Sequence, residues 1–296
     1  MIYLRSGCKI NLFLKIGAKE KNGLHKISSL FLPLAEPADL LCIEGRSGNE
    51  FEFICPIERL NNNDNLVCRA WQVYAKASGF RPGLRVSLLK NVPWGAGLGG
   101  GSGNAAAMLA WLNSVAPRPL SDGKMLELGR SLGSDVPFFL RNVPALVEGT
   151  GNLVKEACLA DKNFFILLVW PEIEISTAWA YAEFDKFCAA NGREKSLTKH
   201  GFRNKNLVFT VPGEEGLEIS QILENDFEEP VFAAWPTLLE LKGKMQARGA
   251  TYSGMSGSGS TIFGIFEDIY RARKAWTEFS GHYEHVFLAQ YPNAGV

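Results

Sequence analysis

The hydrophobic positions of this chain follow two periods that alternate along its length. Between Lys9 and Ile16, apolar residues occupy every second position, which is the spacing of a strand with one buried face. From Phe164 to Val169 every residue is apolar, as in a short strand that is buried on both faces. Elsewhere apolar residues recur every three or four positions, as in amphipathic helices. This alternation predicts a mixed α/β protein.

Individual elements can be placed by the signals at their ends. The best defined helix starts after Asn65, which would cap it, and stops at Gly79. Further helices are predicted to begin near Asn104, Ser121, Ser176, Pro236 and Asp268. Strands are predicted at Lys9–Ile16, Leu40–Glu44, Phe51–Ile54, Leu84–Leu89, Ala145–Glu148, Phe164–Val169 and Thr261–Phe266. A domain boundary is expected between Gly149 and Asn163, where a glycine turn and a charged stretch precede an apolar strand.

Charge and cysteine content narrow the class of protein. The 296 residues include 31 basic and 31 acidic side chains, so the chain has no overall field to attract nucleic acid or an acidic membrane. An anionic ligand must therefore be held by a local site. The six cysteines are scattered without a CxxC pair, as reduced core thiols usually are. No apolar run has the length of a signal peptide or a membrane span, so we expect a cytoplasmic protein that binds neither nucleic acid nor membrane.

A glycine-rich segment follows the predicted strand Leu84–Leu89. It holds six glycines in eleven positions, and each of them costs backbone entropy that ordinary structure would avoid. The segment leads into an alanine-rich predicted helix, whose first amides and positive dipole end would face a ligand such as phosphate. We therefore take the whole segment as a candidate phosphate loop, consisting of Pro93, Trp94, Gly95, Ala96, Gly97, Leu98, Gly99, Gly100, Gly101, Ser102 and Gly103.

Three other interpretations of this loop fit less well. A Walker-type loop needs a lysine directly after its glycines, and this segment has none. The positions from Gly95 to Gly100 fit the dinucleotide fingerprint GxGxxG. However, the acidic residue expected about 20 positions later would fall near Asp122, within a helix-start signal. A flexible linker would lack the strand before the loop and the helix after it. The pattern favours a nucleotide loop of another type.

The order proline, three residues, Gly-Leu-Gly, small residues and a helix resembles the ATP loop of the GHMP kinases. This superfamily takes its name from galactokinase, homoserine kinase, mevalonate kinase and phosphomevalonate kinase. The form GAGLGGGSGNAA is most similar to members that phosphorylate a cytidine-linked methylerythritol. Those members usually carry two serines where this chain has Ser102 and Gly103, so the resemblance leaves the Mg²⁺ ligands unassigned.

Two further motifs supply candidate catalytic residues. Lys9 and Asn11 share the polar side of the first predicted strand, where a solvated edge is the alternative. The stretch Cys-Lys-Ile-Asn-Leu resembles the A-K-I-N-L signature of the same kinases, which implies that both side chains lie at the reaction centre, with Asn11 against the substrate. Asp135 stands in GSDVPFF, where it is either an ordinary turn residue or, as the resemblance implies, the base. In that family Asp135 would take the proton of the attacking hydroxyl, and Lys9 would keep Asp135 ionised and steady the phosphoryl group.

A second glycine-rich segment, from Gly249 to Thr261, is similar to the SGSG motif that GHMP kinases carry near the C-terminus. Alone it could be a long turn before the strand Thr261–Phe266. Together with the first loop it would provide a second set of backbone donors for the phosphates, from Ser256, Gly257, Ser258 and Gly259.

The resemblance also implies an acceptor site. Asn22-Gly23-Leu24-His25 is similar to a D-G-Y-H stretch in which an aromatic ring stacks on cytosine and the histidine bonds the edge of the base. Here Leu24 replaces the aromatic ring and His25 is retained. Tyr181, in a segment similar to the family's S-T-x-x-x-Y, is the second stacking candidate, with a place in the helix core as the alternative. Asn65 would approach adenine, although capping of its helix alone explains it.

These motifs together imply an α+β kinase fold of two domains, residues 1–156 and 157–296, with ATP between them. The expected reaction transfers the γ-phosphate of ATP, with Mg²⁺, to the 2-hydroxyl of the cytidine-linked methylerythritol, a small-molecule alcohol. Two alternatives stay open. One is another GHMP-type kinase for a mevalonate-, homoserine- or sugar-like alcohol, and the other is a nucleotide-binding regulator without catalysis, which would not need Lys9 and Asp135. The oligomeric state, monomer or homodimer, is left open as well.

Overall fold

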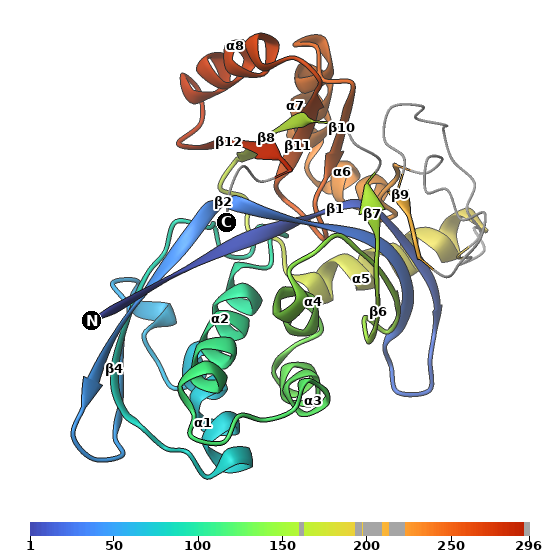
Figure 1. The fold of residues 1–296 in the computed structure, drawn as a ribbon. Helices are drawn as coiled ribbons and strands as arrows, with labels where there is room; N and C mark the ends of the chain where they lie inside the picture. The colour runs from blue at the N-terminus through green and yellow to red at the C-terminus, as the bar shows by residue number, and fades with distance from the viewer. Residues whose placement is uncertain (160–162, 193–196, 198–208, 213–222, 293–296) are drawn as a thin grey trace. The chain divides into compact units, whose positions relative to one another are not determined.

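A computed structural model of the chain describes residues 1–159, 163–192, 197, 209–212 and 223–292. The chain forms two compact units that are interleaved along the sequence (Figure 1). Unit 1 consists of Met1–Cys8, Pro37–Val92 and Gly99–Asn142, and unit 2 consists of Lys9–Glu36, Pro93–Leu98 and Val143–Val296. The division into residues 1–156 and 157–296 stays a prediction.

Unit 1 combines a sheet with helices. The second half of β2 (His25–Arg46) pairs antiparallel with β4 (Gly83–Leu89), and β3 (Phe51–Ile54) pairs parallel with β4. A 3₁₀ turn spans Glu58–Leu60. The helices of this unit are α1 (Leu66–Ser78), α2 (Gly100–Val115), α3 (Asp122–Leu132) and α4 (Val136–Arg141), and α2 packs against the other three.

The sequence explains where α1 begins, ends and packs. Asn65 caps it by accepting a hydrogen bond from the backbone N–H of Val67 at 3.0 Å. Gly79, with φ of +74°, ends it in the left-handed conformation that glycine adopts without strain. The buried Tyr74 donates its hydroxyl to Asn113 of α2 at 2.8 Å. Helix α1 is thereby fixed against the helix that follows the first glycine-rich segment.

Unit 2 contains a four-stranded antiparallel sheet in the order β10–β11–β8–β12. Its strands are β8 (Phe164–Trp170), β10 (Tyr252–Met255), β11 (Ile262–Phe266) and β12 (His285–Tyr291). Leu167 of β8 lies opposite Gly264 of β11 on one side and opposite Leu288 of β12 on the other. The helices of this unit are α5 (Thr177–Asn191), α6 (Glu228–Ala234), α7 (Pro236–Ala247) and α8 (Ile269–Ser280).

The remaining strand pairs of unit 2 join a segment from the N-terminal part of the chain to segments from the middle of the sequence. The first half of β2 pairs antiparallel with β5 (Ala145–Gly149), which pairs with β6 (Leu153–Glu156). Strand β7 (Cys158–Leu159) pairs with β9 (Phe209–Thr210). The long strand β1 (Ile2–Lys19) pairs with β2, and its residues from Lys9 onward belong to unit 2.

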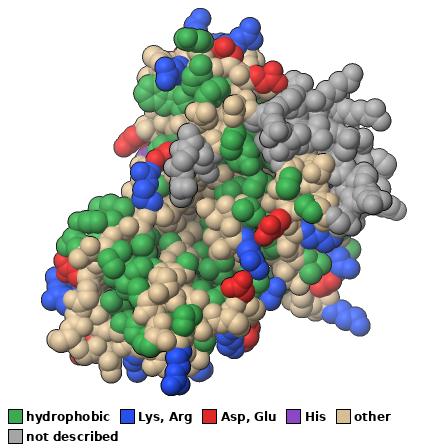
Figure 2. Space-filling view, in the orientation of Figure 1, with side chains coloured by type: hydrophobic (Ala, Val, Ile, Leu, Met, Phe, Trp, Pro, Cys, Tyr) green, Lys and Arg blue, Asp and Glu red, His purple; other side chains and the backbone are tan. Residues whose placement is uncertain are grey.

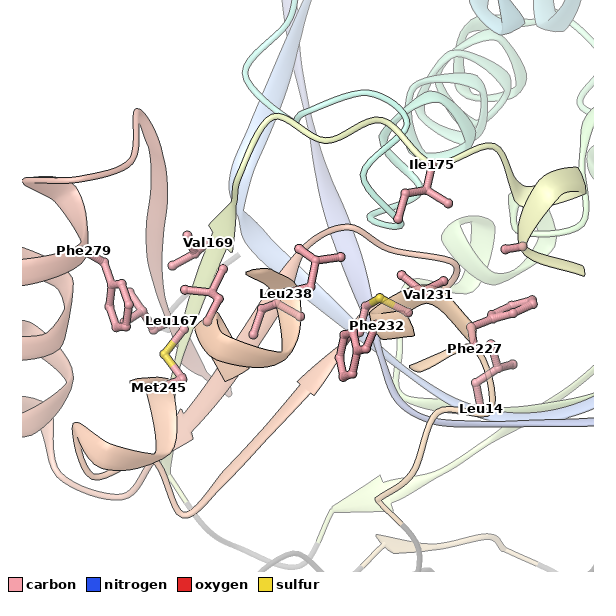
Figure 3. Close-up of a cluster of buried hydrophobic side chains, with 14 of the residues drawn as sticks. Leu14, Leu167, Val169, Ile175, Phe227, Val231, Phe232, Leu238, Met245 and Phe279 are labelled. Atoms are coloured by element: carbon pink, nitrogen blue, oxygen red, sulfur yellow. The ribbon is translucent and has the colours of Figure 1, made fainter. Parts of the chain in front are cut away.

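The core of unit 2 explains why β8 is apolar at every position. Leu167 and Val169 of β8 are fully buried against Leu238 and Met245 of α7 and Phe279 of α8 (Figure 3). Full burial of one such side chain contributes about 1.5–3 kcal/mol. Ile166 and Leu168 on the opposite face of β8 are buried as well, so the strand has no solvated face and strict alternation is lost.

The structure confirms most of the predicted elements and corrects two of them. Helix α2 begins at Gly100 and not near Asn104, so the last glycines of the predicted loop form its first turn. The segment from Gly249 to Thr261 contains β10, so the second glycine-rich loop is a hairpin turn between β10 and β11. Both errors have one cause, because glycine has low intrinsic propensity for either element and only packing decides its conformation. The helices α4 and α6, the strands β6, β7, β9, β10 and β12, and the part of β2 before Leu40 were not predicted.

The surface is consistent with the balanced composition. Basic and acidic side chains are interspersed over the face shown in Figure 2. Within the described residues, none of the helices combines the length and the apolar character that crossing a membrane requires.

Candidate nucleotide and acceptor site

Strand β1 carries Lys9 and Asn11 on one side, and both residues are almost fully buried, at 4% and 3% exposure. The Lys9 ammonium donates hydrogen bonds to Asn11 Oδ1 and to the carbonyl oxygen of Gly97, the latter at 2.9 Å. Asn11 Nδ2 donates to Ser29 Oγ of β2 at 2.9 Å. The polar side of this strand is therefore a buried hydrogen-bonded network and not a solvated edge.

The two glycine-rich segments meet at Gly97, which has φ of +77°. Its carbonyl oxygen accepts from Ser256 Oγ at 2.9 Å as well as from Lys9. A Cβ atom on Gly97 would lie 2.0 Å from the carbonyl oxygen of Ser256, so only glycine fits between the two loops. The contact is extended by the N–H of Thr261, which donates to the carbonyl of Ala96 at 3.3 Å.

The hairpin turn between β10 and β11 also contacts β1. The backbone N–H of Asn11 donates to Ser256 Oγ at 3.3 Å. A Cβ atom on Gly257 would lie 3.3 Å from both Asn11 Oδ1 and Lys9 Nζ. Unit 2 thus brings together parts of three motifs that were predicted separately: the Lys-Ile-Asn strand, the first glycine loop and the second.

Two side chains that the sequence did not single out hold the second loop, those of buried Asn225 and partly buried Glu228. Asn225 Nδ2 donates to the carbonyl oxygens of Met255 at 2.8 Å and Gly257 at 2.7 Å. Glu228 accepts from the N–H of Met255 at 2.8 Å and forms an ion pair with Lys242, while burial raises the pKa of the Glu228 carboxyl. Asn225 precedes α6, so from sequence it would have been interpreted only as a capping residue.

The N-terminal turn of α2 lies in unit 1. Gly99, with φ of +69°, occupies the N-cap position without a side-chain cap, and the geometry of an α-helix leaves its first amides available to a ligand. Gly103 is buried in this turn, where a Cβ atom would lie 2.8 Å from Ser6 Oγ and 3.0 Å from the carbonyl oxygen of Gly7. The absence of a second serine after Ser102 therefore has a local steric reason, since β1 occupies the space.

Asp135 directly precedes α4 in unit 1. It is half-buried, and Ser134 Oγ lies 3.3 Å from its Oδ1 atom. The following residues Val136, Pro137 and Phe138 are buried, as the apolar part of the motif suggested. Lys9 belongs to unit 2, so the pairing of Lys9 with Asp135 stays a prediction.

His25 and Tyr181, the two residues proposed for the acceptor, are in contact. Their rings stack with a centroid distance of 5.1 Å and an interplanar angle of 8°. Buried His25 donates from Nδ1 to the carbonyl oxygen of Gly17 at 2.9 Å, because a carbonyl can only accept. Its Nε2 atom lies 3.2 Å from Asp185 Oδ1, an ion-pair distance. Leu24, beside His25 in the chain, is 55% exposed.

Asp185 was missed by the sequence analysis. It stands four residues after Tyr181 on α5, so the two side chains lie on one face of the helix. That spacing was the available signal, but an acidic residue on a helix is ordinarily solvated, and the sequence cannot show that it faces a buried histidine.

Several other predicted residues have structural partners. Asn65 caps α1 and donates from Nδ2 to the carbonyl of Leu60 at 2.9 Å, so its approach to adenine stays a prediction. Trp94 donates from Nε1 to Glu174 at 3.1 Å. Ser258 Oγ lies 3.1 Å from Thr177 Oγ1.

The hydrogen-bond donors of the two glycine loops suit a nucleotide, whereas they do not define a metal site. Glycine backbone and the first turn of α2 suit phosphate, since they offer N–H groups without side chains in the way. Among the described residues, one trio of acidic and histidine groups lies close enough to share a metal ion, Glu172, Glu284 and His285, and none of these belongs to a predicted motif. The Mg²⁺ ligands remain unassigned.

Comparison with known proteins identifies the class of protein. Residues 65–142 match the GHMP kinases N terminal domain, and residues 214–285 match the GHMP kinases C terminal region. The chain belongs to the GHMP kinase family and is an ATP-dependent kinase of a small molecule with the two-domain fold of that family.

Similar proteins match almost the whole chain. It is 40% identical to the 4-diphosphocytidyl-2-C-methyl-D-erythritol kinase of Nitratidesulfovibrio vulgaris, over 96% of this chain and 98% of that protein. It is 35% identical to the kinase of the same name from Bacteroides thetaiotaomicron, over 88% of this chain and 90% of that protein.

Solved structures agree with these sequence matches. A crystal structure of 4-(cytidine 5'-diphospho)-2C-methyl-D-erythritol kinase superposes with a TM-score of 0.74 at 29% identity, covering 98% of each chain. A mevalonate kinase, at 10% identity, shares the fold with a TM-score of 0.61 and covers 98% of each chain.

Proposed function

We propose that this protein transfers the γ-phosphate of ATP to the 2-hydroxyl of 4-diphosphocytidyl-2-C-methyl-D-erythritol, a step in non-mevalonate isoprenoid synthesis. The observation that carries the proposal is the match to kinases of that name at up to 40% identity over nearly the full length of both chains. The contact between Lys9, Gly97 and Ser256 within unit 2 supports a phosphate-binding centre. Such a role also accounts for the glycine content of both loops.

The chemistry assigns a task to each group. Phosphoryl transfer depends on positioning and on stabilising negative charge, so backbone amides of the glycine loops and the α2 N-terminus would hold the phosphates. Lys9 would neutralise charge on the transferring group, and Asp135 would accept the hydroxyl proton. Mg²⁺, when bound with ATP, would supply further neutralisation of the phosphate charge.

Recognition of the cytidine by Tyr181 stays a prediction, because its ring stacks on His25 and also packs edge-to-face against Phe227 in the core of unit 2. An aromatic face can stack on a base, which is worth about 1–3 kcal/mol per base. Leu24 is exposed beside this pair and would cover the base by apolar contact. A cytoplasmic location and the absence of a nucleic-acid partner stay predictions.

An ADP-release assay coupled to NADH oxidation tests the acceptor. Turnover is expected with 4-diphosphocytidyl-2-C-methyl-D-erythritol and not with mevalonate or homoserine. Turnover of mevalonate or homoserine instead would refute the proposed acceptor. No turnover with any of the three, together with retained ATP binding, would favour the regulator.

The variant Asp135→Asn tests the proposed base. Turnover should fall by about 10²–10⁴-fold, because a positioned base typically contributes that much. Affinity for ADP, measured by calorimetry, should stay close to that of the wild type. Exposed Asp122, at the start of α3, provides a matched control, and Asp122→Asn should keep full turnover. If Asp135→Asn keeps wild-type turnover, the assignment of the base is wrong.

A further inference from the structure

Asp39 on β2 is a fully buried carboxylate, at 0% exposure, with an unusual set of donors. Its Oδ1 atom accepts from the backbone N–H groups of Asn91 and Val92, both at 2.8 Å. Its Oδ2 atom accepts from Asn104 Nδ2 at 2.9 Å and from the Lys90 ammonium. The Lys90 side chain is itself only 5% exposed. All of these groups belong to unit 1.

The positions of these donors in the chain are informative. Lys90, Asn91 and Val92 lead directly into the first glycine loop, and Asn104 is the first residue after it. One carboxylate therefore holds both ends of the segment from Pro93 to Gly103. The Lys90 ammonium also lies beneath the start of α2, 3.2 Å from where a Cβ atom on Gly100 would be.

A purely structural ion pair would not need this arrangement. A buried charge requires compensating donors, and Lys90 alone could provide the charge. The two backbone N–H groups and the Asn104 amide add no charge, but they fix where the loop leaves β4 and where α2 begins. A segment with six glycines has high conformational freedom, so fixed ends reduce the entropy lost when the loop closes on a ligand.

We propose that Asp39 is the positioning residue of the first glycine loop: it sets the separation of the two loop ends and so aims the amides of the first α2 turn at the nucleotide phosphates. The inference rests on the proposed role of this loop in binding ATP, and it is independent of the identity of the acceptor. It assigns no chemical step to Asp39.

The test compares two variants with a matched control. Asp39→Asn removes the charge and replaces one acceptor by a donor. Asn104→Ala removes only the hydrogen bond that ties the start of α2 to Asp39, and it leaves the other three donors on the Asp39 carboxylate. This milder variant should therefore stay folded even if Asp39→Asn does not. Asp226→Asn is the control, because Asp226 forms another buried ion pair, with Lys15, and accepts from the backbone N–H of Ile16 on β1.

Dissociation constants for ADP, measured by calorimetry below the melting temperature of each variant, provide the decisive readout. Asp39→Asn should weaken ADP binding by about tenfold and Asn104→Ala by roughly threefold, and both should raise KM for ATP without raising KM for the acceptor. Asp226→Asn should lower the melting temperature and leave the ADP dissociation constant within about twofold of wild type.

Two results would overturn the proposal. One is an ADP dissociation constant that is unchanged in folded Asn104→Ala and Asp39→Asn. The other is an equal weakening in the control, which would show a general effect of destabilisation. Failure of the proposed acceptor is distinguishable from both results, because ADP binding is measured without an acceptor. If wild-type protein binds ADP without phosphorylating 4-diphosphocytidyl-2-C-methyl-D-erythritol, the role of Asp39 is still tested by the same ADP measurements.

Discussion

Replacement of Gly97 by alanine tests the contact between the two glycine loops. The new Cβ atom would lie 2.0 Å from the carbonyl oxygen of Ser256 and 3.2 Å from that of Gly259. Both are backbone atoms of the second loop, so no side-chain rotation relieves the overlap. The loops would have to separate, and the hydrogen bonds from Lys9 and Ser256 to the Gly97 carbonyl would be strained or lost.

The magnitude follows from three contributions. An alanine held at φ of +77° costs about 1–2 kcal/mol. The overlap with Ser256 costs about 1–3 kcal/mol if the loop shifts as overpacked sites do. Weakening of two hydrogen bonds, one of them from a charged donor, adds about 1–3 kcal/mol. The total of roughly 3–8 kcal/mol should lower the melting temperature by about 10 °C or more.

Gly95 offers a matched control two residues earlier in the same loop. It also has a left-handed backbone, with φ of +64°, but a Cβ atom there would meet nothing closer than Glu174 carbons at 3.9 Å. Gly95→Ala therefore carries only the backbone cost of about 1–2 kcal/mol, and its melting temperature should fall by roughly 3–6 °C.

Differential scanning calorimetry of the two variants measures the difference between them. Gly97→Ala should melt well below Gly95→Ala, and it should lose turnover because Lys9 is no longer held by the Gly97 carbonyl. Equal melting temperatures for the two variants would contradict the reasoning, since they would show that the loops are not in contact at Ser256.

Three further outcomes can be checked separately. Gly103→Ser should lower the melting temperature by several degrees, because overpacking costs about 1–3 kcal/mol. Adding Ser6→Gly to this variant should recover part of the lost stability. If the double variant recovers none of it, the Ser6 side chain is not the obstacle. Tyr181→Ala should raise KM for the cytidine substrate by about 5- to 150-fold with KM for ATP unchanged, and an equal rise in both in steady-state assays would show that Tyr181 is only core. Burial raises the pKa of the Glu228 carboxyl above 4.5 in the folded state, so its contribution to stability is present below the unfolded pKa and is lost as pH rises through the folded pKa. Glu228→Gln can keep the hydrogen bond from the Met255 N–H. In urea unfolding it should therefore become more stable relative to wild type as the pH rises above the ordinary carboxyl pKa of about 4.3. A stability difference that does not change with pH would contradict the raised pKa.

The sequence by itself determined the local structure and the motifs. The limits of β3 were predicted to the residue, and α1 was placed by its Asn65 cap and Gly79 stop, because capping and periodicity act over a few neighbouring positions. The glycine content of both loops indicated phosphate for the same local reason. Where glycine weakened the local signal, at the start of α2 and at β10, the prediction was wrong.

Only the tertiary structure decided which of these motifs meet. The Lys9 ammonium reaches Gly97 across 88 positions and Ser256 reaches it across 159, and no local pattern records such separations. The same holds for Asp39 and Asp185, since an acidic residue that faces a buried partner and one that faces only solvent look alike in sequence. Their roles depend on the donors that the fold brings to them, and in a folded chain burial, not residue type, determines whether a polar group needs a partner.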